Sequence, residues 1–289
     1  MPGEISTKTQ AQEEPIAIRG EIPRPPIFHD KYEEREWMKF RLAQAYRIFS
    51  HYKFDESIAG HITMRDNIRP DCFWVNPMGK HFSIIQPRDL LLVDHDGNIQ
   101  EGSGPFRMLN GAAFVIHSKI HAARPDVMCA AHAHTTYGKA FAALGKELDM
   151  ITQDHCVFYK DHAVYKSFGG VVLQEVEGER IAQTIGSKKA AILQNHGLLV
   201  ATDSIEATVN YFIQLEKACE VQLIADSAAA ATGQATLKID DVEAASTHKT
   251  ICQDTGGWFG GLPQFQALEA RENVRFKFST SVTVTNMPA

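Results

Sequence analysis

Residues 128–137 read MCAAHAHTTY, and this stretch carries the pattern from which the fold can be interpreted. The small and apolar residues 128–131 predict a short buried strand that delivers His132 and His134 at its end. Alternate side chains of a strand point to the same face, so both imidazoles are expected on one side. A helical pattern follows at 137–144.

A second stretch, residues 190–201, reads AAILQNHGLLVA and places His196 after another apolar run. Histidine is a common zinc ligand, and a catalytic zinc site has three protein ligands with one position left for water or substrate. We therefore predict one divalent metal ion on His132, His134 and His196. The alternative is that these are ordinary core or surface histidines, because a His-x-His pair alone is weak evidence.

The bulk composition is that of an ordinary globular protein of 289 residues with a net charge of −6. This mild negative charge argues against a nucleic-acid or anionic-membrane partner. The five cysteines form no CxxC pair, so neither a disulfide framework nor a cysteine-rich zinc site is expected. No signal-peptide pattern and no membrane-spanning apolar run is seen, and the expected compartment is the cytosol.

The chain organisation predicts a polar, proline-rich tail at 1–28, either disordered or an arm, followed by a single domain at 29–289 that includes a C-terminal extension. Helices are predicted at 30–52, 110–123, 137–144 and 177–185, and strands at 60–65, 72–77, 90–94, 128–131 and 190–193. This mixed order indicates layers of the α/β or α+β type.

A long helix is predicted after residue 202, with Asp203 as its N-cap and Glu206 completing a capping box. Its buried stripe is expected to comprise Val209, Phe212, Leu215, Cys219 and Leu223. We expect the helix to dissolve where the alanine-rich stretch 225–231 begins, and we interpret 256–289 as a glycine-rich, then charged, then β-prone segment.

His117 and His121 form a rival metal-binding pair, since residues four apart share one face of a helix. Lys119 lies between them, in place of the glutamate of an HExxH motif. We therefore expect one of these histidines to pack or to bond to the backbone, and the other to lie at the edge of the site.

Several motifs together resemble the class II aldolase/adducin superfamily, in its adducin-like branch. The matching segments are AGHITMRD (59–66), FWVNPMGKHF (73–82), DLLLVDHDG (89–97), AAFVIHSKIHAARPDV (112–127), AAHAHT (130–135) and ILQNHGLLV (192–200). The resemblance implies a three-layer α/β/α fold with a central, mostly antiparallel sheet. It also implies zinc or another divalent ion on the three histidines, and a homotetramer with sites at subunit interfaces.

The chain departs from the aldolases of this family in two respects. The position of their acid/base glutamate corresponds to Ala113, so proton transfer must come from another group. Their phosphate-binding Gly-Asn loop and serine pair correspond to Gly60-His61 and Gly111-Ala112. A substrate without phosphate is therefore expected, with Gly60, His61 and Asn76 as substrate-binding candidates; His61 either meets a carboxylate or enolate oxygen or is structural.

Candidates for the missing proton-transfer group lie in 153–165, a region that approaches a neighbouring subunit's site in the family. Asp154, His155, Tyr159 and His162 are the options, and Tyr159 and His155 are preferred as catalytic residues. A phenol near a divalent cation can act as an acid or a base, because the cation lowers nearby pKa values. The alternative for Tyr159 is packing at an interface.

The chemistry shared by the family is stabilisation of an enolate by a metal ion. The resulting hypothesis is a metal-dependent lyase, of the aldolase or decarboxylase type, acting on a non-phosphorylated hydroxy-carbonyl or keto-acid substrate. Two alternatives remain open: a non-catalytic adducin-like interaction protein with a vestigial site, and an isomerase or dehydratase using the same enolate.

Overall fold

The computed structural model describes residues 21–170, 175–252 and 256–285. Its α-helices are α1 (Lys31–His51), α2 (Gly111–Ala123), α3 (Thr136–Ala142), α4 (Glu175–Ile185), α5 (Ile205–Ala231), α6 (Asp241–Ile251) and α7 (Gly256–Glu272). Its strands are β1 (His61–Arg65), β2 (Cys72–Val75), β3 (Leu91–Asp94), β4 (Cys129–Ala133), β5 (His162–Tyr165), β6 (Ala190–Leu193) and β7 (Gly197–Thr202).

The strands form a seven-stranded sheet in the order β3-β2-β1-β4-β7-β6-β5. Every neighbouring pair is antiparallel except β5 and β6. The expected mostly antiparallel sheet is therefore confirmed. Because β4 lies at the centre of this order, the histidine-bearing strand is flanked on both sides and held rigidly in register.

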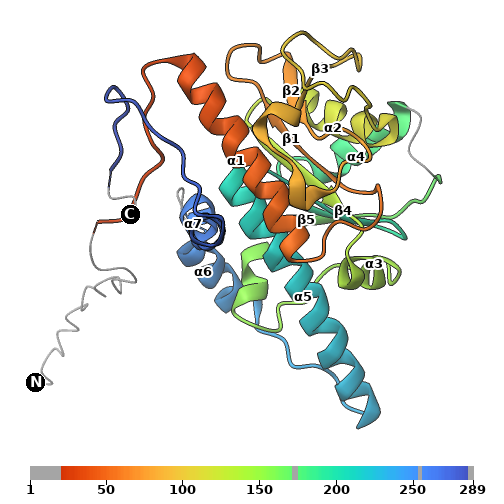
Figure 1. The fold of residues 1–289 in the computed structure, drawn as a ribbon. Coiled ribbons are helices and arrows are strands. Elements are labelled where there is room, and N and C mark those ends of the chain that lie inside the picture. Colours follow the sequence, from red (N-terminus) through yellow and green to blue (C-terminus); the bar gives the residue numbers. More distant parts are fainter. Residues whose placement is uncertain (1–20, 171–174, 253–255, 286–289) are drawn as a thin grey trace, which may run out of the picture.

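Helices cover both faces of the sheet, which gives the predicted three layers (Figure 1). Helices α1 and α5 pack on one face, over strand residues such as Ile62, Ala131 and Val200. Helices α2 and α4 pack on the other face, over Ala130 and Leu199. The two cores alternate along β4, β6 and β7, as the period of two requires, whereas the second face of β2 and β3 belongs to a separate small cluster that includes Phe73 and Leu91.

The long helix α5 differs from the prediction at both ends. Its N-cap is Ser204, whose side chain accepts from the backbone N–H of Ala207, so the Asp203 cap was wrong. Glu206 completes no capping box and is instead buried against Arg41, 2.7 Å away. The helix also continues through the alanine-rich stretch to Ala231, because alanine has the highest helix propensity. The predicted apolar stripe is confirmed: its residues are buried or packed on the core.

The segment after residue 255 is the largest departure from the predicted secondary structure. Helix α7 spans most of this glycine-rich stretch, even though it contains Pro263. Its stability comes from packing against α5 and α1, which overrides the weak helix propensity of glycine. In the described residues after α7, the β-prone character gives an isolated antiparallel bridge between Ile27 and Thr283.

That bridge joins the two ends of the described chain beside α7 (Figure 1). Residues 1–20 of the predicted tail lie outside the described residues. Of the helices that are described, none combines the length and apolar character needed to cross a bilayer.

Candidate metal centre

Three histidines, from β4 and the residue after it and from the turn between β6 and β7, meet at one end of β4. Strand β4 extends to Ala133, so His132 lies within the strand and His134 directly after it, two residues later than the predicted strand end. His196 lies in the tight turn between β6 and β7. Asn195 precedes it with φ 57°, a left-handed conformation that asparagine tolerates well.

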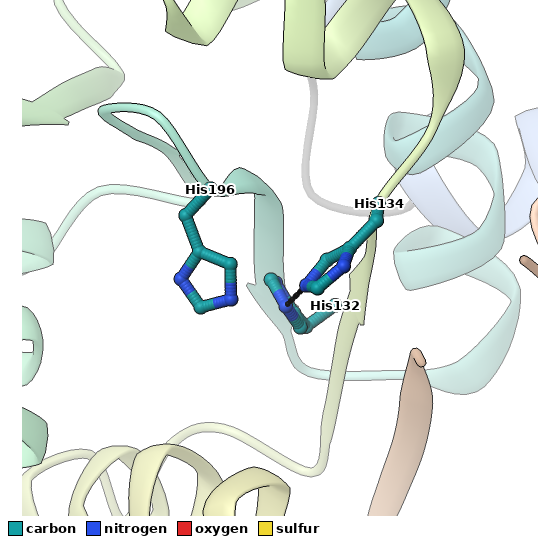
Figure 2. Close-up of side chains that lie close together, drawn as sticks. All are labelled: His132, His134 and His196. Carbon is teal, nitrogen blue, oxygen red and sulfur yellow. Dashed lines mark hydrogen bonds between the residues drawn. The ribbon is translucent and has the colours of Figure 1, made fainter. Parts of the chain in front are cut away.

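The three imidazole rings point toward one another (Figure 2). Ring centroids are separated by 5.0 Å for His132 and His134, 4.7 Å for His132 and His196, and 4.8 Å for His134 and His196. One nitrogen of each ring lies within 4.8 Å of the others. Among the described residues, these histidines form the one group with metal-site spacing.

The hydrogen bonds of His132 show whether this donor set fits a cation. His132 Nδ1 lies 2.9 Å from the carbonyl oxygen of Leu198, which can only accept, so Nδ1 carries the proton. Its Nε2 therefore presents a lone pair, 3.1 Å from Nε2 of His134. Two ring nitrogens at this distance must share either a proton or a cation. A backbone carbonyl that fixes the tautomer of a ligand is also the usual support of a metal-bound histidine.

Burial keeps the three histidines neutral, which is the form that binds metal. Burial, and then the neighbouring His196, lowers the pKa of His132 well below its ordinary value. Burial, followed by the charge of His134, lowers the pKa of His196 to about 4. For His134 the pKa is lowered by burial and then by the ammonium group of Lys139.

The three histidines line a cavity of about 550 Å³ whose other walls are mostly apolar. Ile58, Met78, Ile116 and Phe168 form much of this wall. Lys139 is the one charged side chain among the described lining residues, and it is paired with Glu56. The cavity therefore suits a ligand with a large apolar part and an anionic end.

A buried carboxylate holds the segment that follows His134. Glu216 on α5 accepts hydrogen bonds from the backbone N–H groups of Tyr137 and Gly138, at 3.0 and 2.8 Å, and from the hydroxyl of Thr135. It thereby caps the N-terminus of α3. Burial nevertheless raises the pKa of Glu216, since desolvation outweighs these bonds.

The three predicted substrate-binding residues all lie near the histidines. Gly60 and His61 line the cavity, and Asn76 lines a smaller pocket beside it together with both of them. Gly60 has φ +90°, and a Cβ there would lie 3.2 Å from the carbonyl oxygen of His132. The Asn76 side chain is held by the hydroxyl of Tyr46, 2.8 Å away.

The two preferred catalytic candidates lie elsewhere in their own chain. His155 is buried, with one ring nitrogen 2.7 Å from the hydroxyl of Thr152 and the other 3.1 Å from the carbonyl oxygen of Ala218. Tyr159 lines a different cavity, of about 440 Å³. Neither lines the histidine cavity of the same chain, so their catalytic role stays a prediction that requires a second copy.

The rival pair, His117 and His121, is buried on α2 and does not approach the metal histidines closely enough to join them. Both rings bond to the hydroxyl of Thr63, at 2.6 and 2.8 Å, and the ring of His117 also packs against that of the cavity-lining His61, with centroids 4.1 Å apart. Lys139 was missed by sequence reasoning. Its position on the helix that starts directly after His134 is the signal that could have found it.

Comparisons with known proteins by family model, by sequence and by structure indicate the same family. Residues 40–223 match the family described as the class II aldolase and adducin N-terminal domain. Decarboxylase NovR of Streptomyces niveus is 44% identical over 207 residues, which are 71% of this chain and 76% of that protein. A 4-hydroxy-3-prenylphenylpyruvate oxygenase/4-hydroxy-3-prenylbenzoate synthase of Streptomyces roseochromogenus is 43% identical over 208 residues, 72% of this chain and 74% of that protein. The structure of an L-fuculose 1-phosphate aldolase from Glaciozyma antarctica superposes with a TM-score of 0.79 at 43% identity, covering 86% of this chain and 95% of that one.

Proposed function

Because the chain belongs to the class II aldolase and adducin family, we propose that it is a metal-dependent lyase that cleaves or decarboxylates a non-phosphorylated hydroxy-carbonyl or keto-acid substrate. The observation that carries the proposal is the convergence of His132, His134 and His196 at the cavity wall. Zinc is the first candidate for the ion, since three imidazoles leave one tetrahedral position for the substrate.

A divalent cation at this position would supply positive charge that stabilises a developing enolate oxygen. The chain's own residues orient the metal ligands and bind the substrate. The Leu198 carbonyl keeps His132 in the tautomer that offers Nε2. Lys139 lines the cavity and would offer its ammonium group to a carboxylate, and the apolar walls would pack against the apolar part of the substrate.

The cavity also favours a substrate class. Lys139 alone among the described lining residues is cationic, which is a weak donor set for a phosphate group. The apolar wall suits an aromatic or prenyl-bearing acid instead. Two relatives have names that specify a decarboxylase and a prenylbenzoate synthase, which supports this choice.

The proposal includes a homotetramer in which a neighbouring copy supplies Tyr159 to the site, while His155, buried and bonded through both ring nitrogens within its own chain, positions the segment that carries Tyr159. Exposed apolar side chains at the cavity, Ile58 and Phe168, are each 56% exposed in the single chain. A neighbouring subunit that covered them would also bury the cavity mouth. No carboxylate lines the cavity among the described residues, so an acid or base from a neighbour would fill a chemical need.

Oxygen-dependent decarboxylation is a second candidate. It is favoured by the same lack of a lining carboxylate, and by the relative from Streptomyces roseochromogenus that is named an oxygenase. Imidazole ligands suit iron as well as zinc. This candidate predicts oxygen uptake in proportion to substrate consumed, whereas the lyase requires none.

The test is the metal content of the purified protein, measured for wild type, His196→Ala and the control His81→Ala. His81 is a surface histidine with a 60% exposed side chain, so its loss should leave the metal in place. We expect about one ion per chain in wild type and control, and its loss in His196→Ala. A panel of aromatic keto acids, assayed with and without oxygen, then separates the two reactions. A folded wild type without metal or turnover would refute both and favour a non-catalytic adducin-like protein.

A further inference from the structure

A polar cavity of about 320 Å³ lies where the end of α6 approaches the residue before β6. Cys252, the residue that caps the C-terminus of α6, lines this cavity and lies beyond residue 223, where the match to the family ends. Of the five cysteines, Cys252 is partly exposed and the other four are buried. A small oxidant that diffuses through solvent therefore reaches this thiol most readily.

Lys189 brings an amine to this thiol. Its Nζ lies 3.4 Å from Sγ of Cys252. The amine is held there because it also donates to the carbonyl oxygen of Val157, at 3.1 Å, and pairs with the carboxylate of Asp161, at 2.9 Å. The ring of Tyr211 closes another side, with its centroid 4.5 Å from Nζ. A long and usually flexible side chain is thus fixed with its nitrogen against the sulfur.

The thiol is held by Val157 as well. Sγ of Cys252 lies 3.6 Å from the carbonyl oxygen of Val157, to which the S–H group donates. Burial raises the pKa of the Cys252 thiol, and the charge of Lys189 offsets part of this effect. Because the thiolate is the form that oxidants attack, Cys252 should stay reduced at neutral pH without an oxidant and should react faster as the pH rises.

We propose that Cys252 and Lys189 form a redox-sensitive pair, which hydrogen peroxide joins by a covalent bond between Sγ and Nζ. In the first step the peroxide transfers one oxygen atom to the thiol, which gives a sulfenic acid and one molecule of water. In the second step the ammonium group of Lys189 loses a proton to solvent, and the nitrogen lone pair attacks Sγ. The S–N bond forms, the S–O bond breaks, and the hydroxyl group leaves as water with a second proton of the amine. Sulfur is oxidised by two electrons, and the peroxide is reduced to water.

The bond would tie the C-terminal extension to the sheet beside the segment that carries Tyr159. Val157 and Asp161, which both contact Lys189, lie on either side of Tyr159 in the chain. The reaction also removes the ammonium group that pairs with Asp161. Peroxide would therefore alter the contacts of this segment without a reaction at the metal ligands. The cross-link itself does not depend on the proposed function.

The experiment treats the full-length protein with hydrogen peroxide in mildly alkaline buffer and follows the intact mass and the peptide map without reducing agent. We expect the wild type to lose the mass of two hydrogen atoms and to yield a peptide containing residue 189 joined to one containing residue 252. Dithiothreitol should reverse both changes, because thiols reduce the S–N bond. The matched control is Cys156→Ser, which removes a buried cysteine of the same region and should leave the cross-link in place.

Lys189→Arg keeps the positive charge but replaces the amine by a guanidinium group, which stays protonated. The sulfenic acid should then persist and be labelled by dimedone, whereas Cys252→Ser should give neither label nor cross-link. Should Lys189→Arg fail to fold, Lys189→Gln takes its place. A wild-type peptide map without the link between 189 and 252 would overturn the inference. The same loss of mass in the Lys189 variant would also overturn it, since the bond would then be a disulfide.

Discussion

Gly197 is the residue that lets the turn carrying His196 approach β4. A Cβ at this position would lie 2.6 Å from the carbonyl oxygen of Ala133 and 3.3 Å from the ring of His134. Because the first distance is far below van der Waals contact with a backbone atom, the turn itself would have to move. The position of the third ligand thus depends on a residue that has no side chain.

Gly197→Ala is therefore expected to weaken metal binding at least tenfold and to lower the free energy of unfolding by about 1–3 kcal/mol. Competition with a chelator measures the first effect, and urea unfolding the second. Gly111→Ala is the control, since nothing lies within 4 Å of a Cβ built at that first residue of α2. Equal metal affinity in the two variants would contradict the argument.

His121 links stability to pH. Burial, and then the charge of Arg65, lowers its pKa to about 3 from an ordinary value of 6.5. The folded state therefore favours the neutral form. Its contribution to stability is fully present above about pH 6.5, and it is lost as the pH falls from there toward 3.

The free energy of unfolding should consequently decrease on acidification from pH 7.5 to 5, and by less in His121→Gln than in the parent protein. Both proteins should carry His196→Ala, so that competition between protons and metal does not contribute. Urea denaturation at the two pH values gives the comparison. Identical decreases with and without His121 would show that this imidazole is not held neutral by the fold.

At the scale of elements, helix α7 is held by close contact with α5. A Cβ on Gly261 would lie 2.3 Å from the carbonyl oxygen of Glu206, the residue that forms a buried ion pair with Arg41. Arg41 also pairs with Glu269 of α7 at 2.9 Å. Three helices are thus joined by one charge network and by a glycine contact.

Gly261→Ala is expected to destabilise the protein by about 1–3 kcal/mol, because the backbone of α5 cannot yield as a side chain does. Its neighbour provides the control. A Cβ on Gly260 would meet the end of the Asn210 side chain, which can rotate away, so Gly260→Ala should cost much less. Thermal unfolding measures the melting temperatures of both variants, and Gly261→Ala should melt at the lower temperature. Equal melting temperatures would argue against the packed position of α7.

At the scale of the whole molecule, the proposed tetramer places Tyr159 of one copy at the histidines of the next. His196→Ala and Tyr159→Phe should each be inactive alone in that case. Subunits of the two variants, mixed and reassembled in equal amounts, should regain activity at about one quarter of the sites by random assortment. Turnover before and after mixing is the measurement, and no recovery in verified mixed tetramers would place both groups in a single chain or remove Tyr159 from catalysis.

The sequence by itself determined the metal-ligand candidates, the three-layer class and most helix and strand locations. His132 and His134 are recognisable because strand alternation is a local rule, and the α5 stripe because helical periodicity is local as well. The high helix propensity of alanine also predicts that α5 continues through its alanines. The alanine-rich composition was nevertheless interpreted as the end of the helix.

Tertiary structure alone decided the features that depend on contacts between distant residues. Helix α7 forms despite its glycines because α5 and α1 provide a surface for it. His61 faces His132 only through the register of β1 against β4, and Glu216 reaches α3 from 78 residues away in sequence. Local periodicity carries no information about such pairings, because their free energy arises only once the packed sheet and helices have brought the residues together.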